Sequence, residues 1–208
     1  MKNSDACFTL IEAGSGSNNI PAGNAIRLSS RIRMHQHFFP HWLDSALLFP
    51  SHYHPEIHPA WPHEKMEFVI LSALATTTNY LFYLPAIHDD FPEEDKKCIR
   101  HWLDWARKNE KYLQHRKDFP QWPNGNTPDG YSHIVENNGF IFWFNGTDSV
   151  QKAEFHLNME ETDFSGSRAE IKQIYPAEDS SHIYNYNDKV VLEIPPESAY
   201  VFSLINRI

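Results

Sequence analysis

The second half of the chain alternates between apolar and polar positions with a period of two. Six segments have this pattern, separated by clusters of Asn, Gly, Asp and Pro: residues 131–135, 139–145, 152–158, 169–176, 189–196 and 199–205. Such alternation puts one face of an extended chain in a core and the other in solvent. Short strands at these intervals, with no helical segment between them, predict an antiparallel sandwich of two sheets.

The first half mixes strand-like and helical patterns. Residues 6–12 form an apolar run bounded by Gly14 and Gly16, which predicts a buried strand running into a flexible loop. Residues 66–84 begin with helical spacing and end in the strand-like segment NYLFYL. Between these segments, four prolines from Pro50 to Pro62 exclude a regular helix or central strand and predict a long ordered loop.

An amphipathic helix is predicted next. Asp89 and Asp90 stand where capping carboxylates go, Pro92 suits a first turn, and the acidic residues 93–95 face the positive end of the helix dipole. One face is apolar at helical spacing, which favours core packing over a ligand platform: Ile99, Trp102, Leu103, Ala106 and Leu113. The segment FPQWPNGNTPDG then breaks the pattern. We therefore expect an α/β segment, residues 1–118, followed by an all-β antiparallel sandwich, residues 119–208.

Charge and cysteine usage exclude several classes of function. The net charge of -9 argues against a nucleic-acid partner, because contact with a phosphate backbone needs clustered Lys and Arg. No apolar stretch reaches membrane-spanning length, and the run from Ala6 to Ile11 is too short for the core of a signal peptide. Cys7 and Cys98 lie far apart without a CxxC partner, so neither a disulfide framework nor a zinc ribbon is predicted.

Several segments resemble the (β/α)8 glycoside hydrolases of the alpha-galactosidase clan. The segment KVVLEIPPESAYVFSLI looks like the closing hairpin of the antiparallel domain that follows the barrel, and GFIFWFNGTDSVQKAEFHL looks like its central hairpin. The segment EEDKKCIRHWLDWARKNEKYL is similar to the last barrel helix. The resemblance is best over residues 90–208. It implies that the chain corresponds to the C-terminal part of such an enzyme, a partial (β/α) barrel followed by its β-sandwich.

The resemblance also implies a sugar-binding site, but this sequence differs from the clan's pattern there at two points. The segment FTLIEAGSGSNN is similar to the Glu-containing, Gly-Ser-rich loop that lines the clan's sugar site. However, Ser29 and Ser30 stand where the clan's acid/base Asp is expected, and the Arg-x-Asp that closes the Gly-rich loop is missing. The strand that bears the nucleophile would lie outside these last β/α units.

A glycosidase needs two carboxylates flanking the scissile bond. The first half offers six candidates: Glu12, Asp44, Glu64, Glu67, Asp89 and Asp90. Glu12 is the best catalytic candidate, because it ends an apolar strand just before a flexible loop, where catalytic groups of barrels are found. A solvated carboxylate at a strand end would have the same sequence pattern. Asp89 and Asp90 are assigned to helix capping.

The histidines suggest a different chemistry. His35 with His37 and His52 with His54 have the spacing that puts two imidazoles on one face of a strand, and further candidate ligands lie nearby: His41, Glu56, His58 and His63. Cupin-like metal enzymes place such pairs in a Gly-punctuated β-barrel, whereas these lie among prolines and in a helical pattern. We therefore expect polar loop packing, no metal and no cofactor.

Sugar binding needs flat aromatic rings beside hydrogen-bonding side chains, since a pyranose offers apolar C–H faces and a rim of hydroxyls. The substrate-binding candidates lie in the proline-rich segment and in the predicted linker: Trp42, Tyr53, Trp61, His63 and Trp122. Rings in proline-rich loops also pin such loops to the body of a protein, so both interpretations stay open.

The sequence therefore predicts the C-terminal part of a glycoside-hydrolase-like protein with carbohydrate as its partner. We expect it not to hydrolyse glycosides alone, because half the catalytic pair is missing, and to assemble with a second chain that completes the barrel or as a homo-oligomer. The first alternative is a non-catalytic carbohydrate-binding or interaction module. The second is a His-rich metal-dependent enzyme.

Overall fold

The computed structural model describes residues 10–13, 33, 37, 45–48, 63–82, 92–177, 179 and 181–207. The chain divides into two compact units, Met1–Lys108 and Asn109–Ile208. These units are defined by internal contacts, and the domain boundary predicted between residues 118 and 119 stays a prediction.

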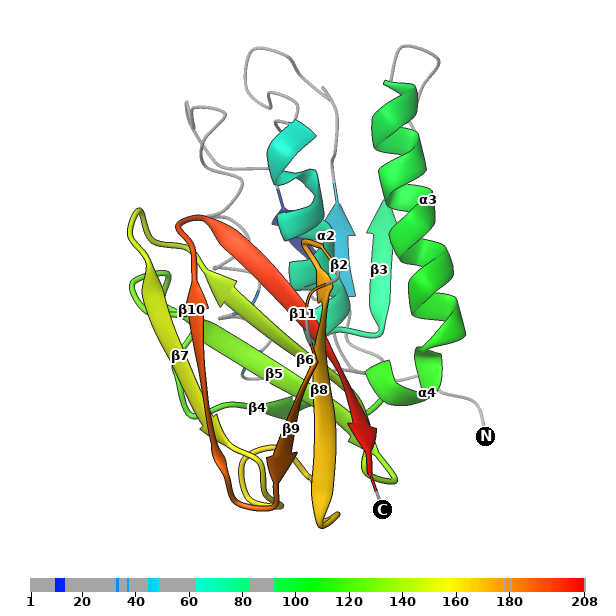
Figure 1. Ribbon diagram of the computed structural model, residues 1–208. Coiled ribbons are helices and arrows are strands. Elements are labelled where there is room, and N and C mark those ends of the chain that lie inside the picture. The colour runs from blue at the N-terminus through cyan, green and yellow to red at the C-terminus, as the bar shows by residue number, and fades with distance from the viewer. Residues whose placement is uncertain are drawn as a thin grey trace. The chain divides into compact units, whose positions relative to one another are not determined.

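The first unit contains a parallel sheet. Strands β1 (Leu10–Ala13), β2 (Ser45–Leu48) and β3 (Asn79–Phe82) lie in the order β1-β2-β3, and both pairs are parallel. Parallel neighbours need a crossover, and helix α2 (His63–Thr76) lies between β2 and β3 along the chain (Figure 1). Helix α3 (Glu93–Lys108) follows β3. This arrangement confirms the predicted α/β segment.

Helix α2 is buried along most of its length. From Phe68 to Thr76 every residue is buried, so this part of the helix is enclosed on all sides. Arg33 is also fully buried, and its guanidinium donates to the hydroxyl of Ser72 over 2.8 Å and lies 5.3 Å from the ring centre of Phe68. A buried cation is tolerated when it is hydrogen-bonded and in contact with an aromatic ring.

Helix α3 has the predicted buried face. Ile99, Trp102 and Ala106 are buried, and the acidic first turn and basic last turn complement the helix dipole. Leu113 is buried in the short helix α4 (Glu110–Leu113), which belongs to the second unit. The capping role assigned to Asp89 and Asp90 falls outside the described residues.

The second unit is an antiparallel sandwich (Figure 1). A six-stranded sheet has the order β4-β5-β6-β11-β8-β9, and a two-stranded sheet consists of β10 and β7. The strands are β4 (Lys117–Asp118), β5 (Asp129–Val135), β6 (Asn138–Asn145), β7 (Gln151–His156), β8 (Arg168–Tyr175), β9 (Ser181–Asn185), β10 (Lys189–Ile194) and β11 (Ser198–Asn206). All six predicted strands are present, and the predicted fold class is confirmed.

The core of the sandwich lies between its two sheets. Phe119 and Trp143 stack with ring centres 4.9 Å apart, and Phe155 of β7 lies 5.1 Å from Phe119. All three rings are buried in one apolar cluster. Because each aromatic ring buries a large apolar area, this cluster stabilises the contact between the sheets.

Both predicted hairpins are wrong. Strand β6 pairs with β5 and β11, whereas β7 pairs with β10, so the segment after β6 crosses from one sheet to the other. The segment between β10 and β11 crosses back in the same way. Alternation along the sequence identifies the buried face of a strand, but it does not identify the strand's hydrogen-bonded partner.

The two crossing segments are joined by the side chain of Asn145, the last residue of β6, which is fully buried. The two N–H groups of its carboxamide lie within hydrogen-bonding distance of three carbonyl oxygens, those of Ser149 (2.8 Å), Ile194 (2.9 Å) and Pro195 (2.8 Å), so one N–H is shared between two acceptors. Its oxygen accepts from the backbone N–H and the hydroxyl of Thr147, over 2.9 and 2.8 Å. One side chain thus satisfies backbone groups of both crossing segments.

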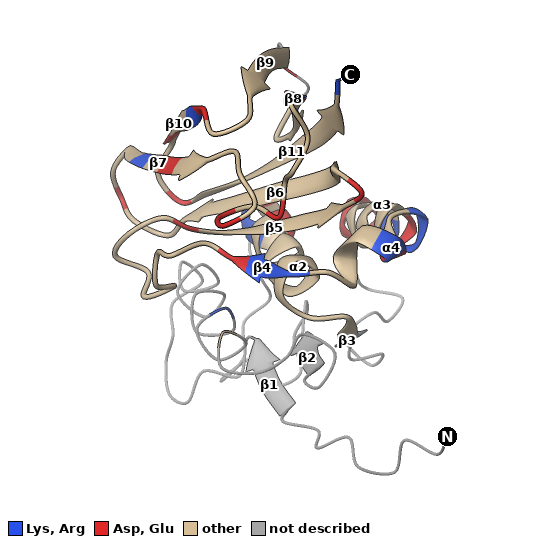
Figure 2. Cartoon of the chain, turned by 90° about the horizontal axis from the view of Figure 1, so that it is seen from below, with Lys and Arg blue, Asp and Glu red and all other residues tan. Residues whose placement is uncertain are grey.

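The surface of the sandwich carries charges of both signs. In Figure 2, basic and acidic segments lie close together on β7 and β10, where Lys189 and Glu154 form an ion pair of 2.6 Å. Such an exposed pair contributes little to stability. In the part of the chain that the structure describes, no helix has the length and apolar character needed to cross a membrane.

We predict that Asn145→Ala lowers the free energy of unfolding by about 2–4 kcal/mol, because it leaves several buried backbone groups without partners. Urea unfolding followed by near-ultraviolet circular dichroism measures the change. Asn126→Ala is the matched control, since Asn126 is exposed in a loop, and should change the value by less than about 0.5 kcal/mol. Equal effects of the two substitutions would contradict the role of Asn145.

Candidate functional site

The predicted catalytic residue Glu12 lies near the carboxyl end of β1. It is the third of the four residues of this strand, opposite Leu47 of β2 in the parallel register. In (β/α) folds the catalytic groups stand at the carboxyl ends of parallel strands. The backbone position therefore agrees with that of a catalytic residue, and the catalytic role of Glu12 stays a prediction.

The predicted sugar-binding residues are only partly described. Trp42, Tyr53 and Trp61 fall outside the described residues. His63 is the first residue of α2, in the first unit, and Trp122 is an exposed residue of the loop between β4 and β5, in the second unit. Their roles in substrate binding stay predictions.

His63 and Asp95 form a polar contact between α2 and α3. Nδ1 of His63 and a carboxylate oxygen of Asp95 make a short hydrogen bond. The Asp95 side chain is buried, whereas that of His63 is 56% exposed. The hydrogen bond to Asp95 raises the pKa of His63 above its ordinary value, against a smaller opposing effect of burial. This contact gives the His63 imidazole a partner within the fold.

A second polar contact between these helices uses another candidate carboxylate. The indole nitrogen of Trp102 donates to Glu67 over 3.0 Å. Trp102 is buried, and a buried indole N–H needs such an acceptor. Glu67 therefore orients a core side chain, which accounts for its position on α2 without a catalytic role.

The raised pKa of His63 predicts a pH dependence of stability. Because the pKa is higher in the folded than in the unfolded chain, the His63–Asp95 pair stabilises below the ordinary His pKa of 6.5, and this contribution is lost as the pH rises through the folded pKa. We predict that Asp95→Asn lowers the pKa of His63 towards 6.5. NMR titration of the histidine ring protons measures it, with His63→Gln to assign the signal. An unchanged pKa would rule out this pairing.

A metal centre or reactive thiol finds no support in the described residues. No group of three or more His, Cys, Asp or Glu side chains is placed to hold a metal ion in the described ranges. Of the histidine pairs, only His37 is described, in a turn where its backbone N–H donates to Arg33. Burial raises the pKa of the Cys98 thiol to about 12, so this thiol is a poor nucleophile at neutral pH.

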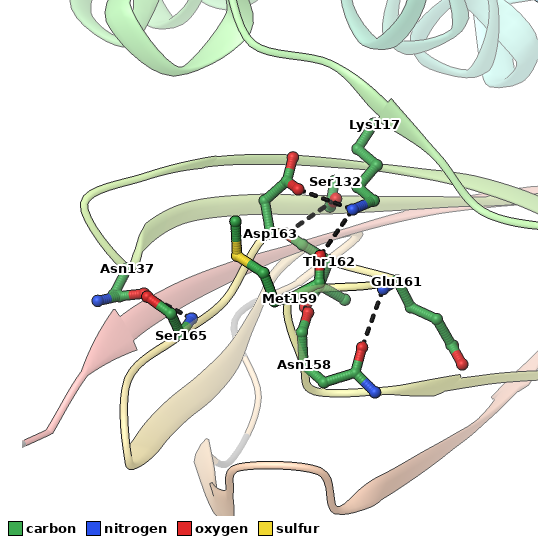
Figure 3. A network of polar contacts seen from close by, with 9 residues as sticks. All are labelled: Lys117, Ser132, Asn137, Asn158, Met159, Glu161, Thr162, Asp163 and Ser165. Carbon is green, nitrogen blue, oxygen red and sulfur yellow. Dashed lines mark hydrogen bonds and ion pairs between the residues drawn. The ribbon is translucent and has the colours of Figure 1, made fainter.

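The loop between β7 and β8 holds a dense polar network (Figure 3). The ammonium of Lys117 on β4 donates to the Asp163 carboxylate and to the carbonyl oxygen of Met159, both over 2.7 Å. The hydroxyl of Ser132 donates to the carbonyl oxygen of Thr162 over 3.2 Å. These contacts attach the loop to β4 and β5, so we interpret the network as structural.

A pocket of about 240 Å³ opens in the sandwich, lined by residues of β8, β9, β11 and the edge strand β10. Its apolar floor includes the buried side chains of Ile171 and Phe202. The half-buried side chains of Tyr184, Leu192 and Tyr200 pack against the core beside it. The rings of Tyr200 and Phe202 stack at 6.0 Å with an angle of 25°. The pocket thus combines an apolar floor with two tyrosines.

Polar side chains lie around this apolar floor: Gln173, Asp179, His182 and Glu193. Burial, together with the negative charge of Asp179, raises the pKa of Tyr200 above its ordinary value. The hydroxyl, which is protonated at neutral pH even without this shift, can donate a hydrogen bond. An apolar pocket with a few converging polar groups is the usual form of a small-molecule site. Such a pocket can hold a small ligand with one apolar face.

The sequence pattern does not reveal this pocket. Tyr184 and Tyr200 read as ordinary inward-facing positions of strands, and β9 was not predicted at all. The segment HIYNY does not alternate between polar and apolar residues, but any strand there places His182 and Tyr184 on one face.

A second hollow of about 390 Å³ lies along α3. Its described lining comes from one face of this helix and includes Lys96, Arg100 and Arg107. Among the described residues this lining belongs to one helix face, whereas the described lining of the pocket in the sandwich comes mainly from the four strands β8, β9, β10 and β11. This distinguishes the hollow from the pocket in the sandwich.

Comparisons with known proteins identify the fold. No family model and no curated protein sequence matches the chain. Among solved structures, an alpha-amylase from Geobacillus thermoleovorans in complex with acarbose matches 88% of this chain and 44% of its own, with 11% identity and a TM-score of 0.58. An alpha-amylase from Anoxybacillus matches over 91% of this chain and 47% of its own length, with 11% identity and a TM-score of 0.55. Alpha-galactosidase I from Mortierella vinacea matches over 96% of this chain and 53% of its own length, with 9% identity and a TM-score of 0.53.

These similarities concern the fold alone, because the identities are low. The chain spans about half the length of the solved structures it matches. The resemblance predicted from the sequence, to the C-terminal part of glycoside hydrolases of the alpha-galactosidase clan, is confirmed at the level of the fold.

Proposed function

We propose that this chain is the C-terminal portion of a glycoside-hydrolase-like protein, that it takes part in carbohydrate processing, and that it does not hydrolyse glycosides by itself. The observation that carries the proposal is the order of the parts along the chain. Parallel strands connected through helices precede an antiparallel sandwich, as in solved alpha-amylases and an alpha-galactosidase.

The parallel strands support the expectation that the chain is inactive alone. The described residues contain three parallel strands, whereas a complete barrel has eight, so β1 and β3 have unpaired edges within this described sheet. Glu12 is the only carboxylate in these three described strands, and glycoside hydrolysis needs two. A second chain that completes the barrel, or further copies of this chain, would supply the missing parts.

The first test is hydrolysis. With 4-nitrophenyl α-galactoside and α-glucoside, we predict that the wild-type chain and Glu12→Gln release nitrophenol no faster than buffer. If the wild-type chain is active and Glu12→Gln lowers the rate by about 100-fold or more, the size expected for a general acid or base, the chain is an enzyme and the proposal of inactivity is wrong.

The second test is carbohydrate binding. We predict that amylose or galactomannan embedded in a native gel slows the migration of the wild-type chain relative to a gel without polysaccharide. Bovine serum albumin run beside it controls for the viscosity of the gel. Unchanged relative migration with both polysaccharides would overturn the proposed carbohydrate role, whatever the outcome of the hydrolysis assay.

One observation favours a second candidate function, a non-catalytic carbohydrate-binding module. The pocket in the sandwich places Tyr184 and Tyr200 beside polar groups without any contribution from the parallel strands. In this case binding would depend on the sandwich, and Glu12→Gln would leave the polysaccharide-induced retardation unchanged.

A further inference from the structure

We infer that the pocket between β8, β9, β11 and β10 binds a single neutral pyranose ring. This inference rests on the carbohydrate role proposed above and assigns to it a binding site in the sandwich, separate from the strand end that carries Glu12.

The size of the pocket limits the ligand. Its volume of about 240 Å³ lies below the roughly 300–1,000 Å³ of sites for drug-sized ligands. One sugar ring fits this volume better than an enclosed oligosaccharide. A longer chain would leave the pocket with its remaining rings in solvent.

Each of the two tyrosines offers an aromatic ring for the apolar C–H face of a sugar and a hydroxyl for the sugar's own hydroxyls. The rings of Tyr184 and Tyr200 provide apolar surface for the C–H face of a pyranose. Neither hydroxyl has a hydrogen-bond partner among the residues that the structure describes. Both hydroxyls reach solvent, so a sugar hydroxyl could replace a water molecule as the partner of each.

The charges around the pocket select against anionic sugars. Asp179 and Glu193 are the charged side chains of the described lining, which includes no Lys or Arg. Carboxylates accept hydrogen bonds from sugar hydroxyls, whereas they repel a phosphate or a uronic acid. The preferred ligand is therefore a neutral hexose.

A β-bulge lies beside the pocket. The register between β11 and β8 shifts between Val201 and Phe202, so that Tyr175 and Gln173 face these residues and Ile174 is the extra residue. A bulge re-aims neighbouring side chains and is frequent next to binding sites. Here it lies directly beside Gln173, which lines the pocket.

The test is an NMR titration of the full-length, isotope-labelled chain. Galactose and glucose are the neutral probes, and galacturonate and glucose 6-phosphate are the anionic ones. We expect saturable shifts of backbone signals centred on the pocket with a neutral hexose. We also expect at least 10-fold weaker association with the matching anionic sugar. No saturable shift with either hexose at 100 mM would overturn the inference.

Substitutions of residues that line the pocket provide a second test, measured by the same NMR titration. Glu193→Gln keeps the shape of an exposed side chain and should weaken hexose binding by about 3-fold or more through loss of a charged acceptor. Tyr200→Phe should weaken it similarly through loss of the hydroxyl, and Tyr200→Ala should weaken it by at least 10-fold. Tyr186→Phe and Tyr186→Ala are the matched controls, because Tyr186 is exposed in the turn after β9 and does not line the pocket; both should bind like the wild type.

The two proposals fail in different ways. If hexose binding is unchanged in Glu193→Gln and in Tyr200→Phe, the pocket is not the binding site, whereas retardation by polysaccharide would still support the carbohydrate role. If the pocket binds hexose and the chain also hydrolyses glycosides, this inference stands and the proposed inactivity is wrong. Because Glu193→Gln alters an exposed residue, its result is informative even if Tyr200→Ala fails to fold.

Discussion

The sandwich depends on the hydrogen bonds of one buried carboxamide. Asn145 ends β6, and its side chain binds the carbonyl oxygens of Ile194 and Pro195 at the end of β10. At this point the chain leaves each sheet for the other, so these backbone groups have no neighbouring strand to pair with. The backbone N–H of Glu197 also donates to the carbonyl oxygen of Thr147 over 2.9 Å, which joins the crossing segments directly. These hydrogen bonds lower the cost of burying backbone groups at both crossings and so favour closure of the core.

The unequal sizes of the two sheets account for the pocket. Six strands form one sheet and two form the other, so β10 and β7 cover only part of the inward-facing side of the larger sheet. Trp143 and Phe155 lie where the sheets overlap and are fully buried. Tyr184 and Tyr200 lie towards the uncovered side and stay half-buried. A binding surface can thus form mainly from strand positions, with Asp179, between β8 and β9, as the only described lining residue outside a strand.

The sequence predicts the strands themselves better than their partners. The apolar residues around Trp143 and Phe202 correctly predict two strands, but β6 is buried on both faces from Ile141 to Asn145, which the expected alternation does not predict. The partner of each strand depends on contacts between distant residues, so both expected hairpins are in fact crossings between sheets. Strand β9 was missed because Ser181, His182 and Ile183 are all exposed, which removes the usual alternation in burial. The pocket was missed for a related reason, since Tyr200 is indistinguishable from a core residue until the sheet that covers it is known.

The burial of Asn145 has a consequence for production of this chain in a eukaryotic secretory pathway. Asn145, Gly146 and Thr147 fit the acceptor sequence for N-linked glycans, which are attached to the carboxamide nitrogen. In the folded chain that nitrogen lies within hydrogen-bonding distance of three carbonyl oxygens in a fully buried position, where a bulky, solvated oligosaccharide has no room. Modification before folding would therefore prevent the sheets from closing, and a bacterial host avoids this competition.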